Sequence, residues 1–571
     1  MENTNDNKKG KRMKTCKMKK LLALLLAAIM VLSMVACAAT EKPAADATDD
    51  QTQGEQPTTA QDEQSNTEEP AEQEEKTIQM WLPGPGKQKD SDMVWEKFNE
   101  MLQDYVPNTK VEFTVIPFDA YQEKFNQMLA SGEAVDLAWV ASWVTGDIAQ
   151  SVIDGNLMPM DDLIAQYGQG IVDMLGQDVV DMHRQQDGKL YHVPCWQGLV
   201  QGGTHRSFAV PTEFAELAGD TWVEDTREIV NTWWNVDSSP ENYQKVFDQF
   251  DKYFGALKEA GKLYGAFKPT DLFCAGMNYS SVNPMTSQIG LIHNDNTFTV
   301  TDFISTDYYK VYAKNMAEYY KKGYIRSDIA SVDLSTINGI SDGSGEFTDN
   351  TVVVVAYQIF CDLTKEQTEK QVGVPLSWMD IQDTAYLGLG NATATAIPYC
   401  ADEPERAMQV LNALYTVPEL YQLLVYGIKD THYVDNGDGT VTVTVSGTAG
   451  SSEAEYGLTK WTIGTCKNSL TTQDDVPGYY DACYEAEKSA KPFPFAQFKF
   501  DATNVADIVA SLDAIDKEYS DMIDKGYTGD NWEETLNKWI AERKAAGVDT
   551  LIEEYQNQIN AFVEEYNVTS W

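Results

Sequence analysis

Three aromatic residues of this chain are followed closely by a side chain that can exchange hydrogen bonds. The pairs are Trp143 with Asp147, Trp196 with Gln197, and Trp378 with Asp380. An aromatic face can stack on a weakly polar ring, and a nearby carboxylate or amide can bind hydroxyl groups around that ring. The pattern therefore indicates a binding site for a small molecule that is both ring-shaped and rich in hydroxyls.

Trp81, Tyr357 and Asp271 form a second group of candidates, because they lie near the ends of expected strands. Each tryptophan has an alternative interpretation as core or interdomain packing, which is the commoner role of this residue. Asp147 can equally cap the helix that follows it. We favour ligand binding for the tryptophans of the three pairs, since they follow expected strands instead of lying on a periodic helix face.

Motifs for catalysis and metal binding are weak in this sequence. The five histidines form no zinc spacing such as H-E-x-x-H, and "LPGPGKQKD" contains no phosphate-binding loop. The stretch "VDNGDGTVTVTV" resembles a calcium loop at Asp435 and Asp438, but Gly437 takes a ligand position and an alternating strand follows. A hairpin turn is the better interpretation of that stretch. We expect no catalytic residue, no metal and no cofactor.

The segments around the candidate residues predict an α/β fold. "KTIQMWLP", "KVEFTVIP" and "VDLAWV" have the composition of strands, and Val94 with Phe98, then Tyr121 with Phe125, recur at helical spacing between them. Alternating strands and helices imply a parallel sheet, and such sheets bind ligands beyond the carboxyl ends of their strands. Those ends are expected at "WLPGPG", "IPFDAY" and "VASWVTGD", the last of which contains Trp143.

Residues 1–36 have the pattern of a secretory signal. Eight basic side chains precede an apolar stretch that begins at Leu21 and is short for a membrane span. The sequence Met34-Val35-Ala36-Cys37 resembles a bacterial lipobox, in which the cysteine is acylated and becomes the new N-terminus. The alternative is an ordinary cleaved signal in which Cys37 is incidental.

Residues 37–76 follow as an acidic segment rich in Glu, Gln, Thr, Ala and Pro, without an aromatic residue. Such a composition cannot bury enough apolar surface to fold, so we expect a disordered linker. The whole chain carries a formal net charge of −45. This charge argues against nucleic-acid binding, which requires a basic face, and against close contact with anionic lipids.

The cysteines after the linker are scattered, and none forms a C-x-x-C pair. In an exported protein an even number of cysteines permits disulfides, although buried thiols are as common in a large domain. Cys466 and Cys483 are the pair for which we first expect a disulfide.

Several segments, in this order, resemble bacterial extracellular solute-binding proteins of carbohydrate-type ABC importers, the maltose-binding-protein-like superfamily. The segments are "VDLAWVASWVTGDIAQSVIDGNLMPMDDLI", "DGKLYHVPCW", "KQVGVPLSW", "ATATAIPYCADEPERAMQVLNALYTVPELYQLLVYGIKDTHYV" and "AGVDTLIEEYQNQINAF". The last is similar to the C-terminal helix of a lipoprotein subgroup of that superfamily. The similarity extends over nearly all of residues 77–571.

The resemblance implies a two-lobed periplasmic-binding-protein-like (type II) fold with hinge crossovers. Lobe one is expected to comprise 77–192 and 376–420, and lobe two 193–375 and 421–571. The three aromatic pairs would then lie along the cleft between the lobes. Closure of the lobes about hinges is the motion by which such proteins trap a ligand.

The function implied by the resemblance is that of a receptor outside the cell, tethered to the membrane by a lipid on Cys37. Such a receptor captures a carbohydrate, here expected to be an oligosaccharide, and delivers it to the permease of an ABC importer. The receptor itself is expected to be a monomer. One alternative is the same fold with a peptide or another solute as ligand. A secreted glycoside hydrolase is a further alternative, but it needs a pair of carboxylates that no pattern in the sequence nominates.

Overall fold

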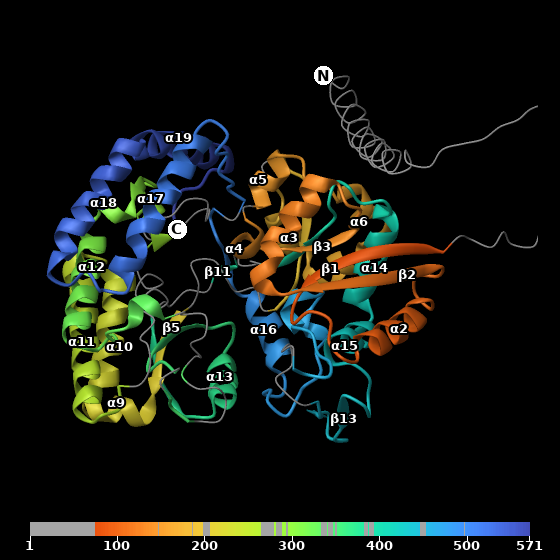
Figure 1. Cartoon of the computed structure of the whole chain (residues 1–571), viewed down its shortest axis with the longest axis horizontal. Helices are drawn as coiled ribbons and strands as arrows, with labels where there is room; N and C mark the ends of the chain where they lie inside the picture. The colour runs from red at the N-terminus through yellow and green to blue at the C-terminus, as the bar shows by residue number, and fades with distance from the viewer. Residues whose placement is uncertain are drawn as a thin grey trace, which may run out of the picture.

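The computed structural model describes residues 75–146, 148–185, 187–197, 206–263, 279–280, 288–292, 295–332, 340, 346–348, 351–381, 386–387, 393–445, 453–495 and 497–571. Within them the chain forms two lobes that lie side by side, and each lobe has its own sheet and covering helices (Figure 1). The expected signal segment, Cys37, the linker up to residue 74, Asp147 and Asp271 lie outside the described residues, whereas Lys76, the last residue of the expected linker, already begins the first strand.

A five-stranded sheet with the order β2-β1-β3-β12-β4 lies at the centre of lobe one. Its strands are β1 (Lys76–Pro83), β2 (Thr109–Ile116), β3 (Leu137–Val140), β4 (His192–Pro194) and β12 (Ala394–Ala396). β1 pairs in parallel with both β2 and β3, which confirms the expected alternation of strands and helices. β12 enters antiparallel between β3 and β4, where its small residues Ala394 and Ala396 are fully buried.

Amphipathic helices cover this sheet. α2 (Ser91–Leu102) buries Val94 and Phe98, and α3 (Phe118–Ser131) buries Tyr121 and Phe125, as the spacing predicts. The Tyr121 hydroxyl also donates to the Trp139 carbonyl of β3 at 2.9 Å, which fixes α3 on the sheet. The other helices of lobe one are α4 (Ser142–Thr145), α5 (Ile148–Ile153), α6 (Asp161–Tyr167), α7 (Gln169–Leu175), α8 (Gln177–Met182), α14 (Pro404–Thr416), α15 (Pro418–Tyr426) and α16 (Tyr479–Glu487).

Lobe two is built on an antiparallel sheet with the order β10-β5-β9, formed by β5 (Arg206–Pro211), β9 (Val355–Gln358) and β10 (Leu376–Asp380). Its helices are α9 (Thr212–Ala218), α10 (Trp222–Asn231), α11 (Pro240–Glu259), α12 (Asp307–Lys321) and α13 (Thr364–Val372). Aromatic side chains dominate its core, in which Trp233 is fully buried and the Tyr253 hydroxyl donates to the Val353 carbonyl at 2.7 Å.

The C-terminal helices α17 (Ala506–Asp524), α18 (Trp532–Ala546) and α19 (Val548–Tyr566) continue lobe two (Figure 1). Tyr519 of α17 and Trp539 of α18 are buried in the same cluster as the aromatic residues of α11 and α12. A small sheet of β6 (Tyr279–Ser280), β7 (Ile289–Ile292) and β8 (Val300–Asp302) adjoins them. Arg543 of α18 is fully buried and forms ion pairs with Asp516 of α17 and Asp302 of β8.

The lobe boundaries expected from the sequence need three corrections, the first of which is that residues 193–196, expected in lobe two, belong to the sheet and core of lobe one. Residues 376–380, expected in lobe one, form β10 and pair with β5 of lobe two, because Trp378 and Met379 are buried in the core of that lobe. Residues 421–445 and 453–487, expected in lobe two, pack on lobe one, because Tyr421 and Cys483 are buried there. The chain leaves lobe one at β15 (Lys491–Pro492), which pairs in parallel with β11 (Tyr386–Leu387), so these two crossing segments lie side by side.

Two further expectations concern a turn and a disulfide. β13 (Tyr433–Asp435) and β14 (Val441–Val443) form an antiparallel hairpin, which confirms the turn interpretation of "VDNGDGTVTVTV". The expected disulfide between Cys466 and Cys483 is wrong, because no bond joins them and the sulfur of Cys466 faces the Lys460 carbonyl at 3.6 Å. The sulfur atom of Cys483 lies instead 3.5 Å from that of Cys361, because α16 faces the start of α13.

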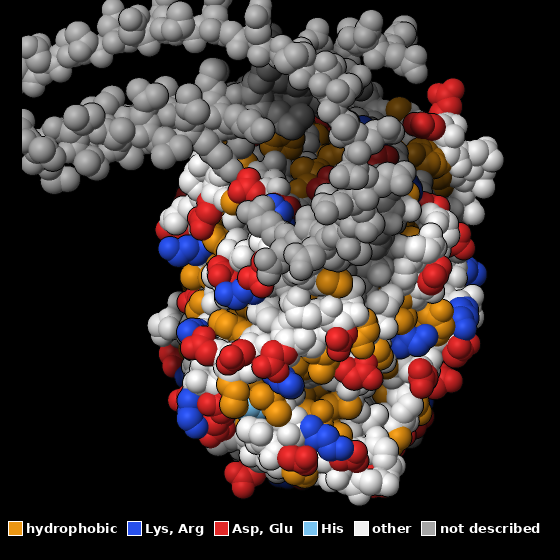
Figure 2. Space-filling model, turned by 90° about the vertical axis from the view of Figure 1, so that its right-hand side faces the viewer, with side chains coloured by type: hydrophobic (Ala, Val, Ile, Leu, Met, Phe, Trp, Pro, Cys, Tyr) orange, Lys and Arg blue, Asp and Glu red, His pale blue; other side chains and the backbone are white. Residues whose placement is uncertain are grey.

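The outer face of lobe one carries acidic and basic side chains interspersed with small groups of hydrophobic side chains (Figure 2). In the part of the chain that the structure describes, no helix is both long enough and apolar enough to cross a membrane.

Candidate ligand-binding site

Three aromatic rings lie together at the edge of lobe one that faces lobe two. Phe118 begins α3, Trp143 lies on α4, and Trp461 belongs to a short 3-10 turn, Lys460–Thr462. The Phe118 ring stacks on Trp143 with ring centroids 6.1 Å apart, and Trp461 lies 5.6 Å from Phe118 and 6.2 Å from Trp143. We call Phe118, Trp143 and Trp461 the aromatic platform.

Local hydrogen bonds explain why Trp143 faces outward. β3 ends at Val140, and the Thr145 hydroxyl donates to the Ala141 carbonyl at 2.9 Å, so the chain turns directly into α4. Trp139 supports the Trp143 ring from below in an edge contact at 5.8 Å. Trp143 is 57% exposed, which is unusual for a residue whose transfer out of water is so favourable.

A cavity of about 270 Å³ lies next to the aromatic platform and shares Trp461 with it. We call it the interlobe cavity, because both lobes supply its lining. Its described lining residues are Gln197, Tyr357, Gln358, Phe360, Thr364, Gln367, Thr368, Gln371, Lys460, Trp461, Cys466, Tyr479 and Tyr480. Aromatic rings and amide side chains dominate this set, a combination that offers stacking faces and hydrogen bonds together.

Backbone hydrogen bonds hold together the two segments of lobe one that line the cavity. Trp196 forms an isolated bridge with Thr465, its amide donates to the Gly464 carbonyl at 2.9 Å, and the Cys466 amide donates back to the Trp196 carbonyl at 2.8 Å. Gln197, the next residue, therefore lies beside the turn that carries Trp461.

The lobe-two wall is α13, which contacts lobe one directly. Gln367 donates from its side chain to the Asp475 carboxylate at 3.1 Å and accepts from the Val476 amide at 2.6 Å. Lys370 donates to the Asp475 carbonyl at 2.6 Å. Because Gln367 is buried, these bonds fix the distance between the lobes at this edge of the cavity.

The electrostatics of the cavity differ from those of the chain as a whole. No carboxylate occurs among its described lining residues, although the net charge of the chain is −45. Burial raises the pKa of Tyr357 to about 12 and that of Cys466 to about 11, so both are protonated at neutral pH. Lys460 is the one cation of the described lining, and it lies 5.2 Å above the Tyr480 ring and 3.4 Å from Asp475. The cavity thus favours uncharged ligands that both donate and accept hydrogen bonds.

The structure brings some of the predicted site residues together. Trp143 lies on the aromatic platform, and Gln197 and Tyr357 line the interlobe cavity. Trp196 is 3% exposed, and its indole N–H donates to Glu487 at 2.8 Å. Its ring contacts Tyr480 at 6.3 Å, so Trp196 supports the cavity wall from behind.

The remaining predicted residues lie elsewhere. Trp378 is buried 5.8 Å behind Tyr357 and donates to Glu369 at 2.9 Å. Asp380 forms an ion pair with Lys365 at 2.8 Å in a separate hollow of lobe two that Trp378 also lines. Trp81 is buried in the core of lobe one. Contact of any of these residues with a ligand stays a prediction.

Sequence patterns missed three of the aromatic residues at the site, Phe118, Trp461 and Tyr480. Phe118 follows β2 in "IPFDAY", so its position after a strand was a usable signal. Trp461 and Tyr480 follow no strand and lie in the segment that the sequence misassigned to lobe two.

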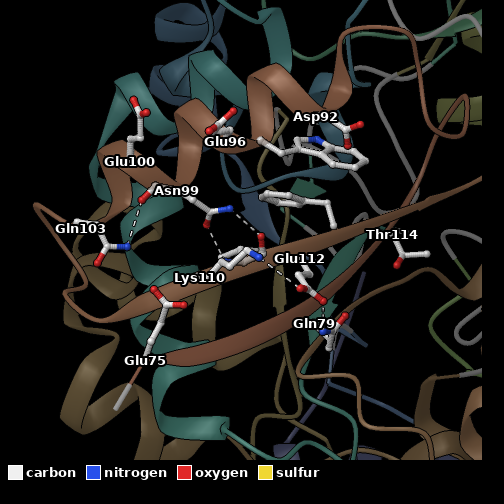
Figure 3. Close-up of a pocket in the computed structure, with 13 residues that line it drawn as sticks. Glu75, Gln79, Asp92, Glu96, Asn99, Glu100, Gln103, Lys110, Glu112 and Thr114 are labelled. Carbon is white, nitrogen blue, oxygen red and sulfur yellow. Dashed lines mark hydrogen bonds and ion pairs between the residues drawn. The ribbon is translucent and has the colours of Figure 1, made fainter. Parts of the chain in front are cut away.

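A larger hollow of about 760 Å³ lies on the outer face of lobe one, between α2 and the edge strand β2. Figure 3 shows carboxylates of Glu75, Glu96 and Glu112 around it, together with Lys110, and Glu112 accepts from Gln79 at 2.7 Å. Its lining comes from lobe one alone, so closure of two lobes cannot enclose a ligand there. The interlobe cavity is therefore the better candidate.

Comparisons with known proteins agree with this arrangement. Residues 95–329 match the family described as bacterial extracellular solute-binding protein, and residues 494–564 match a domain of unknown function, DUF3502. No curated protein sequence matches the chain.

Solved structures share the fold over most of the chain. The N-glycan transport solute binding protein NgtS of Streptococcus pneumoniae has a TM-score of 0.66 at 17% identity, covering 86% of this chain and 99% of NgtS. The structure of NgtS in complex with Man5GlcNAc has a TM-score of 0.59 at 18% identity, again covering 86% of this chain and 99% of NgtS. The S. pneumoniae ABC-transporter substrate binding protein FusA, in complex with kestose, gives 0.52 at 14% identity, covering 85% of this chain and 100% of FusA.

The chain has the two-lobed type II fold that these solved solute-binding proteins share. Residues 95–329 match the bacterial extracellular solute-binding protein family, and the likeness to NgtS over most of the chain is one of fold.

Proposed function

We propose that this protein is an extracellular receptor that captures an oligosaccharide between its lobes and delivers it to the permease of an ABC importer. The observation that carries the proposal is the continuity of the aromatic platform with the interlobe cavity through Trp461. The role is one of binding and release, which requires lobe closure instead of a catalytic group.

The chemistry of the site supports a neutral saccharide. Pyranose and furanose rings present C–H faces that stack on Phe118, Trp143 and Trp461, and their hydroxyls match amide and phenol groups such as Gln197 and Tyr357. A cationic ligand would find no carboxylate among the described lining residues. The platform extends the binding surface beyond the cavity, which favours a chain of sugar rings over a single one.

The solved structures of the same fold support this ligand class. NgtS is described in complexes with Man1GlcNAc and Man5GlcNAc, and FusA in a complex with kestose. These ligands are different oligosaccharides bound by proteins of the same fold. The likeness therefore supports an oligosaccharide as the class of ligand, whereas the side chains of the site determine which oligosaccharide binds.

The start of the chain supports attachment to the outer face of the cell membrane. Cys37 follows a signal-like segment in a lipobox-like context, and residues 37–76 would act as a flexible tether. An acylated Cys37 with this tether would keep the receptor near its permease while the lobes move freely.

Ligand binding to the full exported chain tests the proposal. Neutral oligosaccharides of increasing length, basic peptides and amino acids are titrated while tryptophan fluorescence and melting temperature are recorded. Saturable binding of an oligosaccharide that mass spectrometry recovers intact is the expected result. Binding of peptides alone would refute the proposal that the ligand is a saccharide. Recovery of cleaved sugar would refute the proposal that the protein is a receptor.

A further inference from the structure

Two buried cysteines face each other across the lobe boundary. The sulfur atoms of Cys361 and Cys483 are 3.5 Å apart, and the two residues are 8% and 0% exposed. Cys361 lies between β9 and α13 of lobe two, whereas Cys483 lies on α16 of lobe one. The chain passes from the core of lobe two at Ile359 to that of lobe one at Cys361, so this sulfur pair marks a point where the lobes meet.

The surroundings of the pair make the two thiols unequal. The Thr364 hydroxyl lies 3.7 Å from the Cys361 sulfur, and the Cys361 amide donates to the Thr364 hydroxyl oxygen at 3.0 Å. The hydrogen bond from Cys483 lowers the pKa of Cys361 to about 6, and the same contact raises the pKa of Cys483. Cys361 is also the more exposed of the two thiols, so it is the one that a disulfide from outside reaches first.

Two other buried cysteines, Cys195 and Cys466, face oxygen atoms. The sulfur of Cys195 lies 3.7 Å from the Thr395 hydroxyl, and that of Cys466 lies 3.6 Å from the Lys460 carbonyl. The sulfur atoms of Cys361 and Cys483 would have to approach by about 1.5 Å to reach the bonded distance of about 2.0 Å.

We propose that Cys361 and Cys483 form a disulfide bond in the exported protein, which ties lobe two to lobe one beside the interlobe cavity. The oxidant is the disulfide of a thiol–disulfide oxidoreductase or of a small thiol compound outside the cytoplasm. The Cys361 thiolate attacks that disulfide and releases one thiol, and the Cys483 sulfur then attacks the mixed disulfide and releases the second thiol. The two cysteines are oxidised by two electrons, and the two released thiols take up the two protons.

The bond would restrict the motion on which the proposed function depends. Phe360 and Thr364, on either side of Cys361, line the interlobe cavity, and so does Tyr479, one helical turn before Cys483. With these walls joined, the lobes can open only by pivoting about this edge. The cavity would then lie near the pivot, and the aromatic platform would lie toward the opening.

The inference rests on the proposed extracellular location, because a reducing cytoplasm would keep both thiols free. Its first test is peptide mapping of the full chain, exported by its cell, purified without reductant, and alkylated in denaturant. The expected result is a linked pair of peptides that contain Cys361 and Cys483 and lack two hydrogen masses. Alkylation of both thiols, or linkage of either one to another cysteine, would overturn the proposal.

The second test is the melting temperature with and without a reductant. Reduction should lower the melting temperature of the unaltered protein, whereas Cys361→Ser and Cys483→Ser should already melt lower and be insensitive to reductant. Cys195→Ser, another buried thiol of lobe one, should keep the full response. Equal responses of all four proteins would also overturn the proposal.

Oligosaccharide binding is measured in parallel, so a chain that binds sugar without the bond would refute this inference and leave the proposed function intact.

Discussion

The indole rings of Trp143 and Trp461 lie 6.2 Å apart, centroid to centroid, although Trp143 is on α4 and Trp461 is on a turn beyond α15. Phe118 contacts both rings and completes a continuous aromatic surface. Trp461 also lines the interlobe cavity, so the relationship between these two tryptophans connects an exposed stacking surface with an enclosed polar pocket.

Removal of the Trp461 ring should weaken ligand binding more than any change elsewhere on lobe one. We expect Trp461→Ala to lower the affinity for an oligosaccharide about tenfold or more, which is about 1.4 kcal/mol, because the ring serves both the platform and the cavity. Isothermal titration calorimetry measures this change. Trp95→Ala is the matched control, since Trp95 lies on the outer face of lobe one against Phe113. Equal losses in both variants would contradict the assigned site.

The Gln367 side chain should control how closely the lobes approach. Gln367→Ala removes its bonds to the Asp475 carboxylate and the Val476 amide, each worth about 1 kcal/mol. We expect a larger radius of gyration in small-angle X-ray scattering without ligand, and severalfold weaker binding. Glu366→Ala, an exposed neighbour on the same helix, should change neither quantity. An unchanged radius for Gln367→Ala would show that the contact does not hold the lobes together.

Ligand affinity should be nearly constant between about pH 5 and pH 8, because no histidine or carboxylate occurs among the described lining residues of the cavity. Burial raises the pKa of Tyr357 to about 12, so its hydroxyl remains a donor throughout this range and is lost only as the pH rises toward that value. Calorimetric titrations at several pH values check the prediction. A sigmoidal fall in affinity near neutral pH would place an ionisable group at the site that the described lining lacks.

The buried Arg543 should be essential for the C-terminal part of lobe two. Arg543→Leu leaves the carboxylates of Asp516 and Asp302 buried without their cation, which should cost about 3–5 kcal/mol of unfolding free energy. Urea denaturation followed by circular dichroism measures the loss. Arg326→Leu, which breaks a more exposed ion pair with Asp328, should cost far less, because solvent screens that pair. Similar costs for the two variants would argue against the buried network as a source of stability.

Local patterns in the sequence predicted the first half of lobe one well. The alternation in β2 and the spacing of Val94 with Phe98 in α2 depend on near neighbours, so the sequence reports them directly. The candidates Trp143 and Tyr357 were chosen on the same kind of signal, since each lies at or just after a strand.

Such local patterns could not show to which lobe the segments in the second half of the chain belong. The strand β10 and the helices α15 and α16 have apolar faces that fit either core, and the choice is made by partners distant in the sequence, such as β5 for β10. The error in the lobe boundaries also hid Trp461 and Tyr480, which lie in the misassigned segment.

The sequence by itself determined the α/β character of the chain, its acidic charge, the hairpin at Asp438 and the class of side chains available for binding. The tertiary structure decided which of those side chains meet. Hydrophobic burial is nearly indifferent to sequence position, so it brings Trp461 to Trp143 and Cys483 to Cys361 through the folding of whole lobes, and no local spacing records either contact.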